Sequence, residues 1–506
     1  MHELQSKQSA IKVSHATKSL SAANLKGIDD ALIVTPKTCS ASLWRLIPGA
    51  ARLKTQPARR AEKTGVLTTQ LNNSKTTQVS LAKTKLASDT FGRMEQARKL
   101  VTTILANQPA SVAISVIGFN DAESIQILEL LIEAFAIGSF DLPNYKRKKP
   151  PANRLRKLMV FAENKHADIN AATARANANN LTRWLGALPP NKLTAGSYRG
   201  FAESMAKQQG WAHKFYGEAA LKKLGAGAFL AVAQGNADKE AGILHLRYRP
   251  KGVKDPQRIA LVGKGIIFDT GGNNLKPFRS MLDMHTDMLG SAVALSSLRA
   301  LSDLQAPFQV DCWLALTENR IGAKAYKSQD LIQAMNGKTI KTIHTDAEGR
   351  MALADTLCLA AAEKPNAIMD FATLTGACVA ALTSRYSGVF SNRGSINQML
   401  SDNGQSCGER VWPFPVSAEF TEMVRSDNAD LLQCTIDNDG DHILAACFLR
   451  EFVPESIGWV HMDLSAATHK GGLGLSPTDI TGFGARYVIE LLSDTDKLKA
   501  LVNAND

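Results

Sequence analysis

The apolar and polar positions in the first third of the chain predict a small α/β unit. Residues 111–119 (SVAISVIGF) form an apolar run typical of a buried strand. Residues 124–140 carry apolar side chains at i, i+3 and i+4, the spacing of one helix face. The basic, proline-bearing residues 145–157 predict a surface loop, and residues 157–164 predict a returning strand. We therefore expect residues 1–165 to fold as an N-terminal α/β domain.

An alanine-rich segment separates this unit from the rest of the chain. Residues 166–189 contain no glycine before Gly186, which predicts a long linker helix that Pro189 and Pro190 terminate. We therefore expect a second domain at residues 190–506.

Beyond the linker, apolar strands alternate with helices. The expected strands are residues 258–269, 308–316, 367–374 and 458–465, and the expected helices begin near Leu289, near Asp330 and after residue 374. This alternation predicts a mostly parallel or mixed sheet flanked by helices. The expected fold is therefore two α/β domains, and in such sheets functional residues gather at the carboxyl ends of the strands.

The net charge of +12 is concentrated in the N-terminal third. Residues 1–160 contain 24 Lys and Arg against 11 Asp and Glu, so they carry +13 and the remaining residues carry about −1. Such asymmetry occurs in surfaces that meet nucleic acid or anionic lipid, and also in lysine-rich faces that are simply solvated. The sequence favours the solvated face.

The cysteines and the apolar runs indicate a soluble cytoplasmic protein. The seven cysteines are an odd number and include no CxxC pair, so neither a disulfide framework nor a zinc knuckle is predicted. The first twenty residues lack the apolar core of a signal peptide, and no apolar run reaches the length needed to span a membrane. We expect no membrane partner.

The segment LVGKGIIFDTGGNNLKP groups charged residues around one strand end. Lys264 lies inside the apolar strand, Asp269 lies at its carboxyl end, and a Gly-Gly turn precedes Lys276. Taken alone, this pattern fits a tight turn after a strand as well as it fits a functional site.

Three further carboxylates follow in two short segments. Asp287 stands at the start of a predicted helix, where the helix dipole favours a carboxylate. Asp346 and Glu348 are two residues apart, so in an extended segment both project to the same face. Carboxylates forced together raise their own pKa values unless cations lie between them, and zinc, manganese and magnesium accept such ligands. A bound cation is therefore predicted beside Asp346 and Glu348.

The blocks GKGIIFDTGG with LKP, MHTDMLGSA and HTDAEGRMALAD occur in the order of the signature blocks of one family. The chain resembles the leucyl aminopeptidase (cytosol aminopeptidase) family of dinuclear metallo-exopeptidases. The resemblance covers about Leu181 to Leu492, including DFATLTGA, and fades in the basic N-terminal third.

The resemblance implies two adjacent divalent ions, Zn²⁺ or Mn²⁺ and alternatively Mg²⁺, which activate water for peptide hydrolysis. The implied metal ligands are Lys264, Asp269, Asp287, Asp346 and Glu348. As a ligand, Lys264 must lose its proton, which costs about 4–5 kcal/mol at neutral pH unless strong positive charge lies nearby. The implied catalytic residues are Lys276, which would stabilise the oxyanion, and Arg350, which would hold a bicarbonate that shuttles the proton.

The resemblance also implies a pocket for the first side chain of the substrate. Its residues are Met284, Thr373, Gly376, Ser465 and Thr468, and the carbonyl of Leu374 would accept a hydrogen bond from the substrate. Ser465 and Thr468 replace residues that are often apolar, so we expect a broad residue preference.

Several positions depart from the family pattern. His285, Leu289, His344, Asp441 and His442 differ in type from the residues usual there. His344 could be a neighbour that orients Asp346, an additional ligand or an ordinary packed histidine. The sequence assigns no role to Asp441 or His442.

The function implied by the resemblance is release of leucine and other N-terminal amino acids from peptides, by a homohexamer. The alternative is a DNA-binding accessory or regulatory protein that uses the same scaffold. Basic clusters at Lys146–Lys149 and Arg52–Arg60 permit this alternative, although no DNA-reading motif accompanies them. The chain has neither a GxSxG elbow nor a phosphate-binding loop, so a serine hydrolase and a nucleotide cofactor are not predicted.

Overall fold

The computed structural model describes residues 4, 11–56, 65–149, 151–163, 166–437 and 439–503. The chain forms two compact units. The N-terminal unit consists of Lys7–Asn180 with Lys470–Asp479, and the C-terminal unit consists mainly of Leu181–His469 with Ile480–Asp506. The division falls within helix α6 (Ile169–Gly186).

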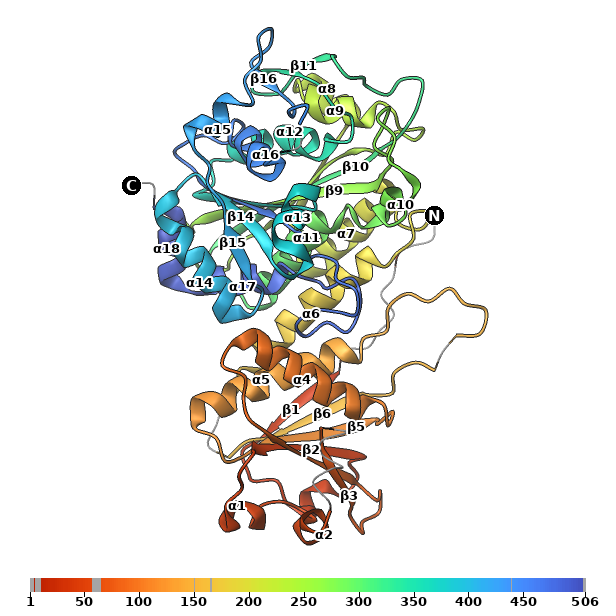
Figure 1. Cartoon of the computed structure of the whole chain (residues 1–506), viewed down its shortest axis with the longest axis vertical. Helices are drawn as coiled ribbons and strands as arrows, with labels where there is room; N and C mark the ends of the chain where they lie inside the picture. The colour runs from red at the N-terminus through yellow and green to blue at the C-terminus, as the bar shows by residue number, and fades with distance from the viewer. Residues whose placement is uncertain are drawn as a thin grey trace. The chain divides into compact units, whose positions relative to one another are not determined.

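The N-terminal unit is built on a six-stranded sheet with the order β1-β6-β5-β2-β4-β3, and α4 and α5 lie on one of its faces (Figure 1). Alternate side chains of one central strand enter two cores: Leu32 and Val34 pack in the core of α4 and α5, whereas Ala31 and Ile33 pack with Leu53. The elements are β1 (Lys12–Ala16), η1 (Ala22–Leu25), β2 (Asp30–Pro36), α1 (Ala41–Arg45), α2 (Ala50–Lys54), β3 (Leu67–Gln70), β4 (Gln78–Thr84), α4 (Thr90–Leu105), β5 (Ser111–Val116), α5 (Asp121–Gly138) and β6 (Lys157–Phe161). The predicted α/β architecture is confirmed.

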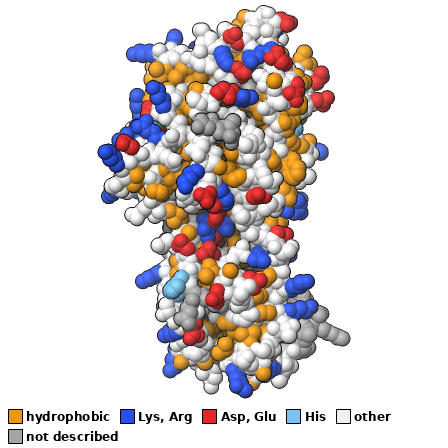
Figure 2. All heavy atoms as spheres, turned by 90° about the vertical axis from the view of Figure 1, so that its left-hand side faces the viewer, with side chains coloured by type: hydrophobic (Ala, Val, Ile, Leu, Met, Phe, Trp, Pro, Cys, Tyr) orange, Lys and Arg blue, Asp and Glu red, His pale blue; other side chains and the backbone are white. Residues whose placement is uncertain are grey.

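On the face drawn in Figure 2, the described basic residues of this unit do not gather into one stripe. Lys146–Lys149 are exposed in the long loop between α5 and β6 (Figure 1), whose described residues form neither helix nor strand. In the Arg52–Arg60 cluster, Lys54 lies over the Trp44 ring at 5.3 Å from its centroid, and residues 57–60 lie outside the described residues. Figure 2 shows the Lys and Arg side chains of this unit scattered among acidic, apolar and neutral groups on the face drawn. That face offers no continuous track for a duplex backbone.

The C-terminal unit is centred on an eight-stranded mixed sheet with the order β15-β14-β17-β13-β9-β10-β8-β7. The neighbouring strands β17, β13, β9 and β10 run parallel to one another, whereas β14, β8 and β7 are antiparallel to their inner neighbours. The strands are β7 (Ala212–Gly217), β8 (Gly242–Tyr248), β9 (Arg258–Asp269), β10 (Gln309–Asn319), β13 (Ala367–Ala372), β14 (Ser387–Ser391), β15 (Val411–Pro413) and β17 (Gly458–Asp463). The predicted strand 258–269 coincides with β9, and the predicted mixed sheet is confirmed.

Helices cover both faces of this sheet. Helix α11 (Leu289–Asp303) packs closely on one face because two glycines leave room for it. A Cβ on Gly263 would lie 2.4 Å from the Cα of Ser291, and a Cβ on Gly290 would lie 2.1 Å from the carbonyl oxygen of Phe371. On the other face, α9 (Gly227–Ala233), α12 (Glu348–Ala362) and α16 (Asp441–Arg450) share one apolar core with the sheet. The predicted helix start near Leu289 is confirmed.

The other helices described in this unit lie around this layered centre. They are α7 (Ala195–Gln209), α8 (Glu218–Lys223), α10 (Phe278–Met281), α13 (Gly376–Leu382), α14 (Asn397–Cys407), α15 (Ala418–Glu422), α17 (Ala485–Ser493) and α18 (Thr495–Val502), with the 3-10 turns η2 (Met284–Thr286), η3 (Thr383–Arg385) and η4 (Gly394–Ile396). Among the helices formed by the described residues, none combines the length and the apolar content that crossing a bilayer requires.

The helix predicted near Asp330 is wrong. Strands β11 (Leu331–Gln333) and β12 (Thr339–Lys341) form an antiparallel hairpin there, and β16 (Leu431–Leu432) pairs with β12. The dipeptide Asn336–Gly337 lies in the turn, and Gly337 has a φ of 90°. The helix was expected from the alternation of strands and helices along the chain, whereas Asn-Gly strongly favours a tight hairpin turn, and this local signal decided the structure here.

Polar residues stand at the carboxyl ends of the four neighbouring parallel strands. Asp463 ends β17, Asp269 ends β9, Asn319 ends β10, and Thr373 directly follows β13. Because these strands are parallel, their carboxyl ends lie at the same edge of the sheet. This edge is where the fold brings charged and polar side chains together.

Candidate active site

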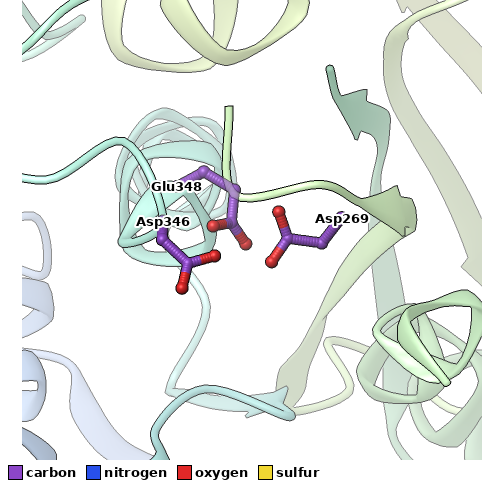
Figure 3. Close-up of side chains that lie close together, drawn as sticks. All are labelled: Asp269, Asp346 and Glu348. Carbon is purple, nitrogen blue, oxygen red and sulfur yellow. The ribbon is translucent and has the colours of Figure 1, made fainter. Parts of the chain in front are cut away.

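Four carboxylates converge at this edge of the sheet. Asp269 comes from the end of β9, Asp287 from the turn between η2 and α11, Asp346 from the loop before α12, and Glu348 from the first position of α12. Carboxylate oxygens of Asp269, Asp346 and Glu348 all lie within 4.8 Å of one another, and the three side chains point into a common space (Figure 3). Asp269, Asp287 and Glu348 are buried, and Asp346 is partly exposed.

Asp346 and Glu348 meet through a helix start and not through an extended segment, so the geometry predicted for them is wrong. Ala347, between them, has φ −103° and ψ 34°, and α12 begins at Glu348. The chain therefore turns at Ala347 and directs both carboxylates inward. The prediction that the two carboxylates lie together nevertheless agrees with the structure.

Two lysines lie among these carboxylates. The Nζ of Lys264 is 2.8 Å from Oδ2 of Asp287 and 3.1 Å from Oε1 of Glu348, and it donates a hydrogen bond of 3.0 Å to the carbonyl oxygen of Thr373. The Nζ of Lys276 is 2.8 Å from Oδ2 of Asp269 and also pairs with Asp346. All five implied metal ligands and Lys276 are thus within one network.

A glycine makes room for Lys264. A Cβ on Gly349 would lie 2.5 Å from the Cε of Lys264, so any side chain at position 349 would collide with the lysine. The Gly-Gly turn after β9 has a related role, because Gly271 and Gly272 have φ values of 85° and 65° and the amide of Gly271 donates to Oδ1 of Asp269 at 2.8 Å. Glycines of the signature blocks therefore leave room for Lys264 and form the turn that positions Asp269.

Burial and repulsion between the carboxylates make it unfavourable for all four to be ionised at once, so the cluster needs added positive charge. Burial, together with neighbouring carboxylates, raises the pKa of Asp346 to about 6, of Glu348 to about 7 and of Asp287 to about 8. Burial lowers the pKa of Lys264 and Lys276, but the surrounding carboxylates more than offset this and raise both values. Four carboxylates share two ammonium groups, so the donor set fits divalent cations, which prefer oxygen ligands.

The stability of the metal-free protein should therefore depend on pH. A carboxyl whose pKa is higher in the folded state than in the unfolded chain binds its proton more tightly when folded, so stability falls as pH rises between the two values. For Asp346, Glu348 and Asp287 this window runs from about pH 4 to about pH 8. The lysines, whose pKa values are raised, stay protonated throughout this window and add no slope.

We expect the Tm of the chelator-treated protein to fall across this window, and we expect added Mn²⁺ or Zn²⁺ to remove the fall at its upper end. Differential scanning fluorimetry with and without metal measures both slopes. A metal-free Tm that is flat or rising from pH 5 to pH 8 would contradict the expectation.

Asn319 is a site residue that the sequence analysis missed. Its Nδ2 donates to Oδ1 of Asp269 at 2.8 Å and to the carbonyl oxygen of Thr345 at 3.0 Å, and it lies 3.4 Å from Oε2 of Glu348. The side chain is buried. Its position at the end of an apolar strand, beside the strand that ends in Asp269, was the signal that could have identified it.

Replacing this amide should weaken metal binding without removing a ligand. In Asn319→Leu, which keeps the side-chain size, the carboxylates of Asp269 and Glu348 lose the donor that orients them. We expect metal affinity to fall about 10- to 100-fold, the usual effect of losing a group that orients a ligand. Competition with a chelator measures the affinity, and Gln398→Leu, which changes an exposed amide in α14, is the control. Unchanged affinity in Asn319→Leu would contradict this role.

Arg350 lies in the first turn of α12 and is almost fully buried, with its side chain 2% exposed. Both carboxylate oxygens of Asp441 lie 2.8 Å from its Nη2, and its Nη1 donates to the carbonyl oxygen of Gln433 at 3.1 Å. Among the described residues, its Nε has no partner. The guanidinium therefore already has a carboxylate partner within the chain.

The residues of the implied substrate pocket occupy several elements. The hydroxyl of Thr373 donates to Oδ1 of Asp287 at 2.7 Å, and the hydroxyl of Ser465 donates to the carbonyl oxygen of Tyr386 at 2.6 Å. Met284 begins η2, Gly376 begins α13, and Thr468 is exposed in the segment after β17. The joint pocket formed by these residues stays a prediction.

The loop around Leu374 is fixed by a buried carboxylate that the sequence analysis also missed. Oδ1 of Asp463 accepts a hydrogen bond of 3.1 Å from the amide of Leu374, and Oδ2 accepts one of 2.6 Å from the hydroxyl of Thr375. These bonds hold the backbone whose Leu374 carbonyl was predicted to meet the substrate.

Two of the histidines that differ from the family pattern, His344 and His442, have contacts in the structure. The Nδ1 of His344 accepts a hydrogen bond of 3.3 Å from the amide of Asp346, so His344 contacts the backbone of this residue and not its carboxylate. His442 is buried, with its ring edge-on to Phe414 at 4.5 Å between centroids. His285 lies in η2, beside Met284.

Comparison with known proteins places this geometry in context. Residues 180–489 match the family described as “Cytosol aminopeptidase family, catalytic domain”. A protein of Pseudomonas syringae pv. syringae (strain B728a), named “Probable cytosol aminopeptidase”, is 37% identical over 386 residues, which cover 73% of this chain and 76% of that protein.

Two solved structures share the fold. The bottromycin maturation enzyme BotP in complex with Mn is 26% identical and superposes with a TM-score of 0.78, covering 94% of this chain and 100% of that one. A mutant of tomato leucine aminopeptidase, at 24% identity, has a TM-score of 0.83 and covers 97% of this chain and 98% of that one, which shows likeness of fold.

Proposed function

The chain belongs to the cytosol aminopeptidase family and is a metal-dependent aminopeptidase, and from this premise we propose how its own residues bind metal and substrate. Two divalent ions, Zn²⁺ or Mn²⁺ and alternatively Mg²⁺, would be held by Asp269, Asp287, Asp346 and Glu348. Lys264, once deprotonated, would be the fifth ligand. The observation that carries this proposal is the convergence of four carboxylates on two lysines at the carboxyl ends of parallel strands.

The ions, when bound, supply an activated water and polarise the scissile carbonyl. The ammonium groups of Lys264 and Lys276 partly neutralise the carboxylates.

Lys276 and the loop after β13 would act on the peptide itself. An ammonium at Lys276 would stabilise the negative charge that develops on the carbonyl oxygen of the scissile bond. The carbonyl of Leu374, held in place by Asp463, would accept a hydrogen bond from a substrate N–H. Lys276 would donate a hydrogen bond to the peptide and the carbonyl of Leu374 would accept one from it, and together they would orient the scissile bond.

The first side chain of the substrate would lie among Met284, Thr373, Gly376, Ser465 and Thr468. The hydroxyls of Thr373 and Ser465 are both engaged in hydrogen bonds within the chain. Because both hydroxyls already donate hydrogen bonds within the chain, an apolar substrate side chain would not leave these donors without a partner. Because one methylene discriminates by only about 1–3 kcal/mol in such pockets, the preference would be broad.

A substrate panel tests this proposal. Protein purified in a metal-free buffer and reloaded with Mn²⁺ or Zn²⁺ should hydrolyse leucine p-nitroanilide and a range of apolar amino-acid amides. The N-acetylated form of the same leucine substrate should be inert, because an aminopeptidase requires a free amino terminus. Absence of hydrolysis with metal occupancy confirmed would refute the proposed site, and cleavage of the acetylated substrate would refute the exopeptidase assignment.

The resemblance to the family further supports a homohexamer in the cytoplasm, with the active sites facing an interior cavity. All seven cysteines are free, as a reducing compartment would allow. Light scattering coupled to gel filtration measures the assembly, and a monomer would contradict it. For the DNA-binding alternative, no observation in the fold or in the comparisons favours it over the peptidase.

A further inference from the structure

The strongest feature outside the ligand set is the buried pair formed by Arg350 and Asp441. The two residues are 91 positions apart in the chain, yet both oxygens of the Asp441 carboxylate lie 2.8 Å from Nη2 of Arg350. The side chain of Arg350 is 2% exposed and that of Asp441 is 17% exposed. Burial acts to lower the pKa of Arg350, and the charge of Asp441 more than offsets it.

Asp441 is presented by a packed element. It is the first residue of α16, where the positive end of the helix dipole favours a carboxylate. The next residue, His442, is buried against Phe414, and α16 shares the apolar core of α12 through residues such as Phe448. The packing of α16 therefore fixes the position of the Asp441 carboxylate.

The pair is linked to the metal-ligand loop through Gln433. The carbonyl oxygen of Gln433 accepts from Arg350, and its side-chain Oε1 accepts from the amides of Ile343 and His344 at 3.0 and 3.1 Å. Its Nε2 donates to the carbonyl oxygen of Ala347 at 3.1 Å. Gln433 thus bonds to both sides of the segment that contains Asp346.

A free anion would have to displace Asp441 to reach Nη2 of Arg350. Asp441 competes from within the same chain, with the advantage of high effective concentration that any tethered group has over a dissolved one. Displacement would also leave a carboxylate beside the site without its cation, which is unfavourable where water is scarce. Among the described residues, the donor of Arg350 that stays open is its buried Nε, a single N–H that cannot give a bicarbonate the two parallel contacts of a guanidinium edge. The donors available at Arg350 therefore do not fit a bicarbonate.

We propose that Asp441 is the built-in anion of this active site, taking the place of the exchangeable bicarbonate that the family resemblance implies at Arg350. Resting on the proposed peptidase function, this makes Asp441 a positioning residue, which acts by holding Arg350 and, through Gln433, the loop of Asp346. The enzyme then needs no bicarbonate. An active site whose arginine is accessible to dissolved anions would, in contrast, depend on added bicarbonate.

The first test uses the unmodified, metal-loaded protein in buffers purged of carbon dioxide. Its kcat, its KM and its Tm should not change when bicarbonate is added, with chloride used to keep ionic strength constant. A saturable rise in kcat or in Tm with bicarbonate would overturn the proposal. Because the Tm measurement needs no substrate, it decides the inference even if the protein proves to have no peptidase activity.

The second test removes the built-in anion. In Asp441→Ala, which opens a space the size of a small carboxylate, kcat should fall about 10- to 100-fold with a smaller change in KM, as for other groups that orient active-site residues. Formate or bicarbonate should restore kcat saturably and raise the Tm of this variant, since a ligand that binds only the folded state stabilises it.

Two control variants separate charge from structure. Asp441→Asn fills the same space without the charge, so it should lose activity and gain nothing from formate. Asp439→Ala removes an exposed carboxylate two positions away and should behave like the unmodified protein. Full activity of Asp441→Ala in anion-free buffer, or loss that no small carboxylate reverses in a folded variant, would overturn the proposal. If Asp441→Ala does not fold, the response of the unmodified protein to bicarbonate decides alone.

Discussion

Asp346→Asn should reduce kcat/KM for leucine p-nitroanilide by at least about 10³-fold, because removing one carboxylate from the metal cluster forfeits several kcal/mol of transition-state stabilisation. Asn keeps the size of the side chain and removes only its charge. The pKa of Asp346 is raised to about 6, so the fold already favours a neutral group at this position. The metal-free variant should therefore be at least as stable as the metal-free parent.

Activity, metal content and Tm together separate this expectation from simple unfolding. Elemental analysis after desalting should show less bound metal in Asp346→Asn, while the metal-free Tm is equal to or above that of the parent. The matched control is Asp427→Asn, which changes an exposed carboxylate of the same unit. If the variant retains full metal content and more than a tenth of the parent activity, Asp346 is not a ligand.

Lys276→Met should lower kcat by about 10²- to 10³-fold, the loss found when a preorganised oxyanion donor is removed. Met preserves much of the apolar stem and removes the ammonium. KM and metal content should change little, since the ligand carboxylates remain in place.

The stability of metal-free Lys276→Met should fall, whereas that of metal-free Asp346→Asn should not. Lys276 pairs with Asp269 and Asp346, and its pKa is raised by their charges, so Lys276→Met leaves the carboxylate cluster with less positive charge. Its Tm in the presence of chelator should therefore fall below that of the parent. Lys324→Met, at an exposed position, serves as the control for the substitution itself. A kcat within threefold of the parent value would remove Lys276 from the catalytic residues.

The charged residues of the site were predictable to different degrees. Repulsion between Asp346 and Glu348 is a matter of elementary electrostatics, and it called for positive charge beside them. Ammonium groups of Lys264 and Lys276 lie there, and the bound metal stays a prediction. The path of the backbone between them was not predictable, because the start of α12 at Glu348 depends on the packing of that helix. Lys264 as a ligand came only from the family resemblance.

Two buried residues that hold the site together, Asn319 and Asp463, were missed for a physical reason. They act through hydrogen bonds to residues far away in the chain, such as that from Asn319 to Asp269, 50 positions away, and that from Leu374 to Asp463, 89 positions away. A sequence pattern records spacing within one element, whereas these bonds form only after four strands have paired in register. The hairpin at Asn336–Gly337 shows the converse, since a two-residue turn signal decided the local structure against the expected alternation of strands and helices.

By itself, the sequence determined the identity and order of the charged residues, the strand from Arg258 to Asp269, and the need for positive charge beside two close carboxylates. These follow from residue chemistry and local periodicity, which act over a few positions. Only the tertiary structure decided that Arg350 pairs with Asp441, because that contact requires α12 and α16 to pack on the same face of the sheet. The sequence located an arginine suited to an anion, and the fold supplied the anion from within the chain.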